Sequence, residues 1–270
     1  MAREERRNVV SKISNKTFRD FMKQASTGSK NLQYGINYYI NQNDKQKFSY
    51  QDTILLSNEQ SQLINQKNRQ FDNLMQRNSH IEKLCLTLKA KSSFISGLGA
   101  SHVTETGINL HSTYGVPFLP GTMLKGIVNQ WLYKASKIDA AFSEILLLTG
   151  LEEDEVSGHT SSKALLHFHD CFFSRIQLKE DIMTPHFQSY YGSDGKFLEE
   201  DQTNPVKFKA VEFQDEAKLW ITWDKSTIID DKEKLAQIII KAIEETGMGA
   251  KTNVGYGAFE VEYDPNVGGN

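Results

Sequence analysis

From residue 81 onward, strand-like and helix-like hydrophobic patterns alternate, and this order constrains the fold more than any other feature of the sequence. Leu84, Leu86 and Leu88 alternate with small or polar residues, which predicts a strand with one buried face. The further predicted strands are 163–174, 206–213, 217–224 and 256–263, and the predicted helices are 122–136, 139–148 and 231–246.

The helix over 231–246 has the clearest amphipathic pattern in the chain. Its apolar side chains recur at helical spacing and form one stripe, made of Leu235, Ile238, Ile239 and Ala242. Gly247 ends the pattern, as glycine often does at helix C-termini. At the start of the earlier helix, Pro120 and Gly121 interrupt the chain, so Thr122 is the expected N-cap.

The order of these elements predicts a fold class. Strand, helix, strand, a long insertion at 175–205, strand, helix and strand together form the split βαβ arrangement. We therefore expect an α+β, modified ferredoxin-like (RRM-like) domain over residues 81–270. Its four-stranded sheet is a common RNA-binding platform, although the fold alone does not define a function.

Residues 1–80 differ in composition from the rest of the chain. They contain 21 asparagines and glutamines and have a weak apolar pattern. Short helices are expected at 17–25, 32–40 and 58–77. We interpret this region as an N-terminal helical extension that packs on the main domain or on a neighbouring subunit.

The composition excludes several classes of protein. The two cysteines, Cys85 and Cys171, cannot form a disulfide framework, and no apolar run approaches the ~18 residues of a membrane span. A cytoplasmic protein that does not associate with membranes is expected. The net charge of −3 argues against a surface that is basic throughout. Residues 1–30 nevertheless carry eight basic and three acidic residues, as either a solubilising tail or a binding segment.

The most informative segment lies between the last helix and the last strand. Residues 247–257 contain four glycines, which allow backbone N–H groups to approach a phosphate or another backbone closely. A nucleotide P-loop is excluded because Ala250 precedes Lys251 and because the segment follows a helix. A dinucleotide fingerprint is excluded because Thr252 replaces its third glycine. A plain tight loop and a contact with a nucleic-acid backbone remain.

Several motifs together resemble the RAMP superfamily of CRISPR proteins, and within it the sixth subunits of Cmr (type III-B) RNA-targeting effectors. They occur in the order of that family over residues 97–259. The motifs are Gly97-Leu-Gly99, His102-Val-Thr-Glu105-Thr-Gly107, Gly115-Val-Pro117-Phe-Leu-Pro120-Gly121-Thr-Met-Leu-Lys125-Gly126, Met183-Thr-Pro185-His186 with Tyr190-Tyr191, and the glycine-rich segment.

This resemblance implies a role in a ribonucleoprotein. Proteins of this kind cap a filament of backbone subunits near the 3′ end of the guide RNA and are regarded as non-catalytic. The implied partners are guide CRISPR RNA, target RNA and other Cmr subunits, including the repeated backbone subunit. That backbone subunit cleaves target with an acidic residue in its first loop, where this chain has Glu105 but no aspartate between residues 92 and 120.

A guide must be held whatever its sequence, so its contacts should go to phosphate and sugar. Lys125 is expected near a helix N-terminus, where free N–H groups favour anions. We predict that the two glycine-marked turns lie side by side and that Lys125 and Lys251 flank one stretch of guide backbone. The RNA-binding candidates are His102, Gly121, Thr122, Lys125, Gly126, His186, Tyr190, Tyr191, Gly247, Gly249, Lys251, Gly255, Tyr256 and Gly257.

The insertion contains a cluster of aromatic residues. His186, Phe187, Tyr190 and Tyr191 lie close together in the sequence. In related backbone proteins an insertion here forms a thumb that interrupts the guide–target duplex, and aromatic rings can stack on bases or wedge between them. An aromatic cluster that anchors the loop to the core is an equal alternative.

Three further residues raise the question of metal binding or catalysis. His167 and His169 share one face of their predicted strand, but Asp170 points to the other face, so no metal site and no cofactor are expected. His102 with Glu105 forms either an acid–base pair or a hydrogen bond that fixes the loop. The main alternative function is therefore a RAMP endoribonuclease that processes guide precursors. A subunit of the other type III effector is a further alternative.

Overall fold

The computed structural model describes residues 41–42, 48–49, 53–99, 106–152, 160–161, 163–183, 205–263 and 265. The predicted helices at 17–25 and 32–40 lie outside these residues. Several residues that were singled out in the sequence also lie outside them, namely His102, Glu105, His186, Phe187, Tyr190 and Tyr191.

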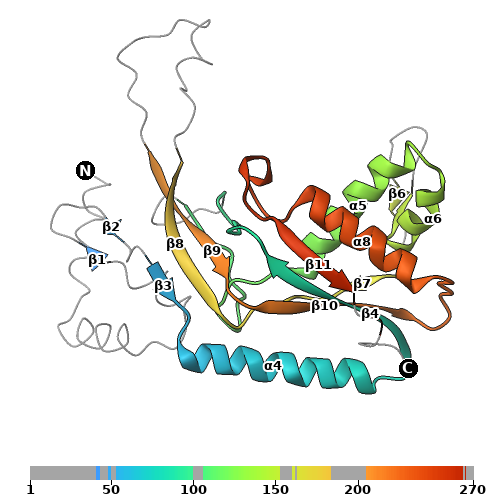
Figure 1. The fold of residues 1–270 in the computed structure, drawn as a ribbon, viewed down its shortest axis with the longest axis horizontal. Helices are drawn as coiled ribbons and strands as arrows, with labels where there is room; N and C mark the ends of the chain where they lie inside the picture. Colours follow the sequence, from blue (N-terminus) through green and yellow to red (C-terminus); the bar gives the residue numbers. More distant parts are fainter. Residues whose placement is uncertain are drawn as a thin grey trace, which may run out of the picture.

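The main sheet has four strands, and its order confirms the predicted split βαβ arrangement. The strands are β4 (Ile81–Ala90), β7 (His167–Phe168), β10 (Glu216–Asp224) and β11 (Phe259–Tyr263), in the spatial order β11-β4-β10-β7. Each neighbouring pair is antiparallel. Helix α5 (Gly121–Ser136) follows β4 and helix α8 (Lys232–Thr246) follows β10, and both cover the same face of the sheet (Figure 1).

The main core lies between this face and the two helices. The alternating leucines of β4 point into it, and Leu84, Leu86 and Leu88 are all fully buried. Strand β10 contributes Leu219, Ile221 and Trp223 in the same alternating pattern. The predicted stripe of α8 enters the same core, so both sequence patterns are confirmed.

A second, three-stranded sheet extends away from the helices. It consists of β3 (Thr53–Leu55), β8 (Ile176–Met183) and β9 (Val206–Phe213) in the order β3-β8-β9. The predicted insertion therefore begins as a regular strand rather than as a loop, because β8 pairs with β9 along its whole length. Its tip, residues 184–204, lies outside the described residues.

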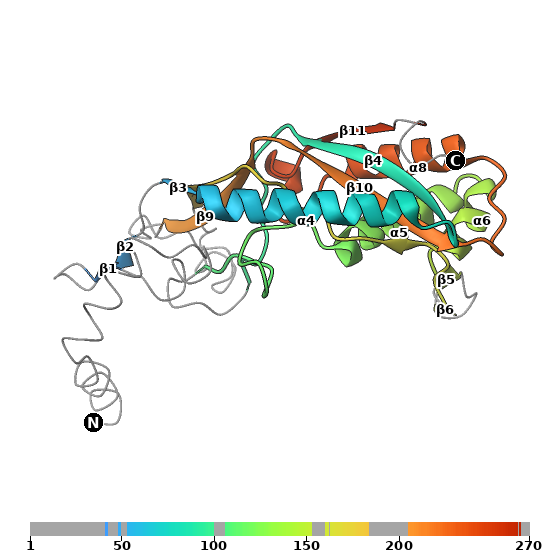
Figure 2. The ribbon, with the colours of Figure 1, turned by 90° about the horizontal axis from the view of Figure 1, so that it is seen from below.

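Helix α4 (Asn58–Arg77) packs on the other face of the main sheet, in agreement with the prediction over 58–77 (Figure 2). Ser57 is its N-cap and accepts a hydrogen bond from the backbone N–H of Gln60. A small apolar cluster of Met75, Cys85 and Trp220 lies beneath this helix. The main sheet is thus covered by helices on both faces.

Two predictions about the region around β7 are wrong. The strand expected over 163–174 is only two residues long, because Cys171 instead exchanges backbone hydrogen bonds with Leu119, the residue before Pro120. The N-cap of α5 is Pro120 rather than Thr122, and no side chain at this position caps the helix. The side chain of Asp170, which is distant in sequence, caps the helix instead. Its Oδ1 accepts a hydrogen bond from the N–H of Gly121 at 2.7 Å.

The remaining elements are short. They are β1 (Asn41–Gln42), β2 (Phe48–Ser49), α6 (Ala141–Leu148), β5 (Leu151–Glu152), β6 (Thr160–Ser161) and the 3-10 helix η1 (Thr252–Val254). Strand β11 begins at Phe259 rather than at 256, because η1 and the following turn occupy the preceding residues. Among the helices of the described residues, none is both long and apolar enough to span a membrane.

Candidate functional site

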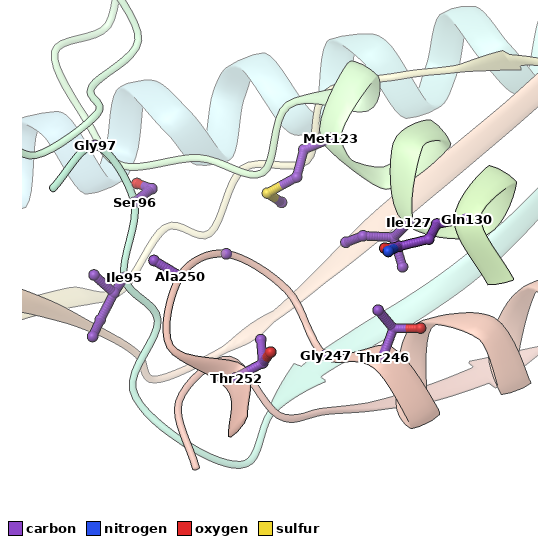
Figure 3. Close-up of a pocket in the computed structure, with 11 residues that line it drawn as sticks. Ile95, Ser96, Gly97, Met123, Ile127, Gln130, Thr246, Gly247, Ala250 and Thr252 are labelled. Atoms are coloured by element: carbon purple, nitrogen blue, oxygen red, sulfur yellow. The ribbon is translucent and has the colours of Figure 1, made fainter. Parts of the chain in front are cut away.

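A cleft of about 450 Å³ separates the first half of α5 from the glycine-rich segment after α8 (Figure 3). Its lining comes from α5, from the segment that follows β4 and from the glycine-rich segment. The lining residues are Ile95, Ser96, Gly97, Met123, Ile127, Gln130, Thr246, Gly247, Gly249, Ala250 and Thr252. Helix α5 and the glycine-rich segment therefore face each other across the cleft, but Gly121 and Gly126, which mark the turn at the start of α5, do not line it.

Two positions in this segment require glycine, because another part of the backbone lies too close to leave room for a Cβ atom. At Gly249, with φ of 87°, a Cβ atom would lie 2.3 Å from the carbonyl oxygen of Ile95. At Gly257, with φ of 70°, it would lie 1.8 Å from the carbonyl oxygen of Met248. These two glycines thus allow close packing on other backbone segments of the protein. The sequence pattern was also compatible with close packing on a phosphate.

Hydrogen bonds hold the two ends of the segment in place. The N–H of Ala250 donates to the carbonyl of Ile95, and the N–H of Gly257 donates to the carbonyl of Ser93, both at 2.8 Å. Gly247 ends α8 with a positive φ, and its N–H donates to Ile243. These contacts fix the segment against the chain that leaves β4.

Between these anchors, three consecutive backbone N–H groups have no acceptor in the described part of the chain. They belong to Lys251, Thr252 and Asn253. Lys251 has φ of 61° and ψ of 32°, and it is the one described residue other than glycine with a positive φ. A left-handed residue followed by a helical turn directs successive N–H groups into one concavity that suits an anion. The left-handed conformation costs about 1–2 kcal/mol for such a residue.

Lys251 is exposed at this concavity, but Lys125 does not line the cleft. Met123, Ile127 and Gln130 share the cleft face of α5, since they follow one another at helical spacing. Lys125 comes two residues after Met123, and two residues turn a helix by about 200°. The structure therefore does not place Lys125 and Lys251 on either side of one groove.

The N-terminus of α5 is also less available to an anion than its sequence suggests. A Cβ atom on Gly121 would lie 2.1 Å from the carbonyl oxygen of Phe168, so this turn is pressed against β7. The N–H of Gly121 already donates to the Asp170 carboxylate. Thr122 and Gly126 are exposed on the same turns without lining the cleft.

Tyr256, a predicted RNA contact, has structural partners instead. Its hydroxyl donates to Asp181 Oδ2 at 2.5 Å, and its ring meets the ring of Phe208 at 6.0 Å. The hydrogen bond to Asp181, with partial burial, raises the pKa of Tyr256 to about 12. The side chain thus anchors the glycine-rich segment to β8, while Gly255 beside it faces open space.

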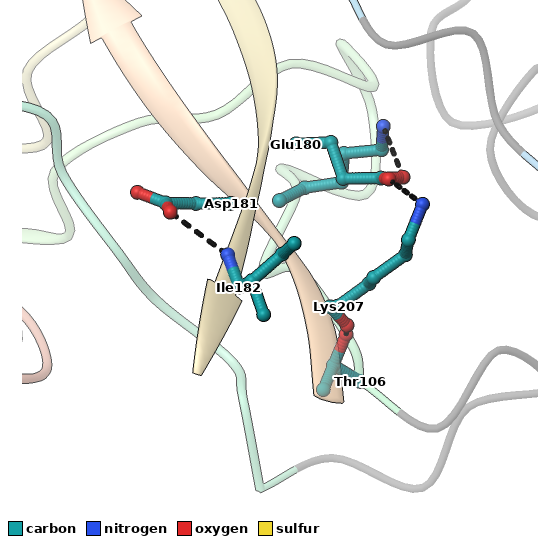
Figure 4. A network of polar contacts seen from close by, with 6 residues as sticks. Thr106, Glu180, Asp181, Ile182 and Lys207 are labelled. Atoms are coloured by element: carbon teal, nitrogen blue, oxygen red, sulfur yellow. Dashed lines mark hydrogen bonds and ion pairs between the residues drawn. The ribbon is translucent and has the colours of Figure 1, made fainter. Parts of the chain in front are cut away.

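A polar network stiffens the neighbouring strands β8 and β9 (Figure 4). Glu180 forms ion pairs with Lys207 and with the buried Lys209. Burial alone would raise the pKa of Glu180, but the hydrogen bond from Lys207 and the nearby positive charges outweigh it and lower that pKa. The hydroxyl of Thr106 donates to the carbonyl of Lys207 at 2.9 Å, which attaches the loop after β4 to the same unit.

His169, which follows β7, forms packing contacts. His169 Nε2 lies 2.9 Å from Thr222 Oγ1, and its ring meets Phe71 edge-on at 5.3 Å. Cys171 donates to the carbonyl of Lys218 at 3.3 Å, and burial raises the pKa of its thiol. Among the described residues, no three histidine, cysteine or acidic side chains are grouped so as to hold a metal ion.

Most residues that line the cleft are not among the candidates that the sequence predicts. Met123, Ile127 and Gln130 recur at the spacing of one helix face, which is a detectable signal in the sequence. Ser96 gives no such signal, because its position depends on the pairing of the preceding backbone with Ala250.

Comparison with known proteins places this geometry in a family. The profile of the RAMP superfamily matches residues 87–260. The CRISPR system Cmr subunit Cmr6 of Pyrococcus furiosus is 25% identical in an alignment 229 residues long, which covers 65% of this chain and 66% of that protein. The match thus spans slightly less than two thirds of the length of that relative.

A solved structure shows the same fold. A chain in the cryo-EM structure of the type III-B Cmr-beta bound to cognate target RNA superposes with a TM-score of 0.51 at 17% identity. The superposition covers 76% of this chain and 65% of that chain. The likeness supports an α+β, ferredoxin-like architecture.

Proposed function

Because the chain belongs to the RAMP superfamily, we propose that it is an RNA-binding scaffold subunit of a type III-B CRISPR (Cmr) effector. In this role it caps the backbone filament near the 3′ end of the guide and helps to hold guide and target RNA. Its similarity to the Cmr6 subunit of Pyrococcus furiosus supports this assignment. Its partners would be the guide, the target and the neighbouring Cmr subunits.

The observation that carries the proposal is the concavity at residues 251–253. Three successive N–H groups and one lysine ammonium provide donors and positive charge that can contact a phosphate whatever base it carries. Such contacts suit the ribose-phosphate backbone of a strand whose sequence varies. The left-handed backbone of Lys251 is held in place by the anchors on either side, as is common where strain serves a binding site.

The covered sheet gives further support. In an RRM the open face of the sheet stacks bases, but here α4 packs on that face and Trp220 beneath it is only 1% exposed. Contacts with RNA are therefore expected away from this covered face, at the glycine-rich segment on the side of α5 and α8. None of the described side chains that line the cleft is charged, which favours binding over acid–base catalysis.

Replacement of Lys251 tests the proposal. Binding of full-length protein to a fluorescent single-stranded RNA would be measured by anisotropy over a series of salt concentrations. Lys251→Ala should weaken binding by roughly three- to tenfold and reduce the salt slope by about 0.7, the value for one phosphate contact on a single strand. Lys225→Ala, an exposed lysine on the turn before α8, makes the same charge change and should have no effect.

A second variant separates the loss of charge from a collapse of the turn. Asparagine tolerates the left-handed conformation, so Lys251→Asn should keep the fold at least as stable as the wild type while it weakens RNA binding. Unchanged affinity and salt slope in both Lys251 variants would show that this segment does not hold the RNA backbone.

A further inference from the structure

The cleft differs chemically from the concavity beside it. Its lining is neutral, and its polar groups are hydroxyls and one amide, carried by Ser96, Gln130, Thr246 and Thr252. Apolar side chains from α5 and from the segment after β4 form the rest of its walls. A phosphate would find no cation in this cleft, whereas a sugar, with apolar faces and hydroxyl edges, matches such a lining.

Ser96 is the distinctive polar group of this cleft. Its Oγ is shielded from solvent and has no hydrogen-bond partner among the described residues. A hydroxyl left in this state costs about 1–3 kcal/mol compared with one that is paired. Rotation about its Cα–Cβ bond between staggered positions can redirect the hydroxyl without moving the backbone.

The cleft that Ser96 lines adjoins the concavity. The N–H of Ala250 donates to the carbonyl of Ile95, which joins the two segments backbone to backbone. Thr252, whose N–H belongs to the concavity, also lines this cleft. Figure 3 shows Ser96 and Ala250 at one end of the cleft, with Met123 of α5 opposite them. One nucleotide can therefore reach both the concavity and this end of the cleft.

We propose that the Ser96 end of the cleft holds a ribose of the bound strand and that the Ser96 hydroxyl recognises its 2′-hydroxyl, which makes the protein selective for RNA over DNA. The phosphate of the same nucleotide lies at residues 251–253, so this inference rests on the proposed function. A 2′-hydroxyl both donates and accepts, which satisfies the unpaired Ser96 Oγ in either orientation. Met123 packs against the apolar face of the sugar.

The test compares single-stranded RNA with DNA of the same sequence, using full-length wild type, Ser96→Ala, Ser79→Ala and Lys251→Ala. Wild type should prefer RNA, and Ser96→Ala should weaken RNA binding by roughly three- to tenfold while DNA binding stays the same. Ser79→Ala makes the same change at an exposed serine before β4, at the opposite end of that strand from Ser96, and should leave the ratio unchanged. Lys251→Ala should weaken RNA and DNA binding by the same factor.

These arms distinguish the two hypotheses. An equal effect of Ser96→Ala on RNA and DNA, no effect at all, or the same change of the ratio in Ser79→Ala would each overturn the ribose assignment. Loss of the Lys251 effect would overturn the proposed backbone contact and leave the RNA-to-DNA comparison valid. As a check without any protein variant, wild type would be titrated with RNAs that carry a single 2′-deoxy nucleotide at successive positions. One position should reproduce the Ser96→Ala loss, and a uniform response would contradict the inference.

Discussion

Helices α8 and α4 pack on opposite faces of one sheet, but different interactions hold them there. Six residues of α8 are buried, all of them apolar: Leu235, Ala236, Ile238, Ile239, Ala242 and Ile243. Helix α4 buries only Gln60, Ile64 and Met75 along its 20 residues. The burial of α8 is therefore driven by the hydrophobic effect, whereas α4 depends more on directed polar contacts.

The polar contacts of α4 reach backbone and side chains of the sheet. Asp72 accepts from Trp220 Nε1 at 2.8 Å and from Lys218 Nζ at 3.0 Å. Asn68 donates to the carbonyl of Phe172 at 2.8 Å. Lys83 of β4 donates to carbonyls in the last turn of α4, which satisfies the end of the helix.

The difference explains how one sheet carries two kinds of surface. The α8 face is the core of the fold. The glycine-rich segment that leaves α8 is anchored in this core by Met248, which is fully buried. The α4 face carries side chains that could bind RNA in an open platform, such as Lys218, Trp220 and His169, but α4 engages them instead. The RNA site is thus expected at the glycine-rich segment on the side of α5 and α8, because α4 occupies the other face of the sheet.

The largest effect in this comparison should come from the core of α8. Ile239 is fully buried, so Ile239→Ala should destabilise the whole domain by about 3–4 kcal/mol through lost burial and the cavity left behind. The free energy of unfolding would be measured by chemical denaturation. Leu74→Ala in α4, at a side chain 57% exposed, is the matched control and should have little effect. Equal losses in the two variants would contradict the contrast between the helices.

A smaller and more local effect is expected from the Asp72 contacts. Asp72→Ala leaves the buried indole N–H of Trp220 without its acceptor and should destabilise the docking of α4 by about 1–3 kcal/mol. Asp72→Asn keeps an acceptor for the indole N–H and loses only the ion pair with Lys218. It should therefore destabilise the docking of α4 less than Asp72→Ala does. Hydrogen exchange would show faster exchange in α4 and unchanged protection in α8. Equal loss of protection in both helices would mean that α4 is part of the global folding unit.

The same contrast explains what the sequence could predict. The leucines of β4 and the stripe of α8 are regular patterns that follow from burial of one face, so strand, helix and strand order were predictable. The short β7 was not, because the competing bridge between Leu119 and Cys171 joins segments distant in sequence. Part of the candidate site was missed for the same reason. Lys251 stands out in the sequence, whereas the roles of Asp170 and Ser96 depend on tertiary contacts.

The smallest expected effect is a pH dependence at the α4 interface. Burial lowers the pKa of His169 below its usual value near 6.5. The positive charges of His167 and Lys67 lower this pKa further, and the negative charge of Asp170 partly offsets them. Just below that pH, the native state therefore binds fewer protons at His169 than the unfolded chain does. The free energy of unfolding should thus be highest above pH 6.5 with respect to this group and should decline as the pH falls. His169→Gln, which retains hydrogen-bonding capacity toward Thr222, should show a shallower decline between pH 7.5 and 5.5 than wild type.

Thermal unfolding over this pH range would measure the difference. His80→Gln is the matched control, since His80 is exposed just after α4, and its profile should follow that of the wild type. Hydrogen exchange at pH 5.5 should place the loss in α4, because His169 packs on Phe71 of that helix. If His169→Gln kept the wild-type pH profile, the protonation of His169 would not be linked to the docking of α4. The polar contacts of Asp72 would then account for the weaker attachment of this helix on their own.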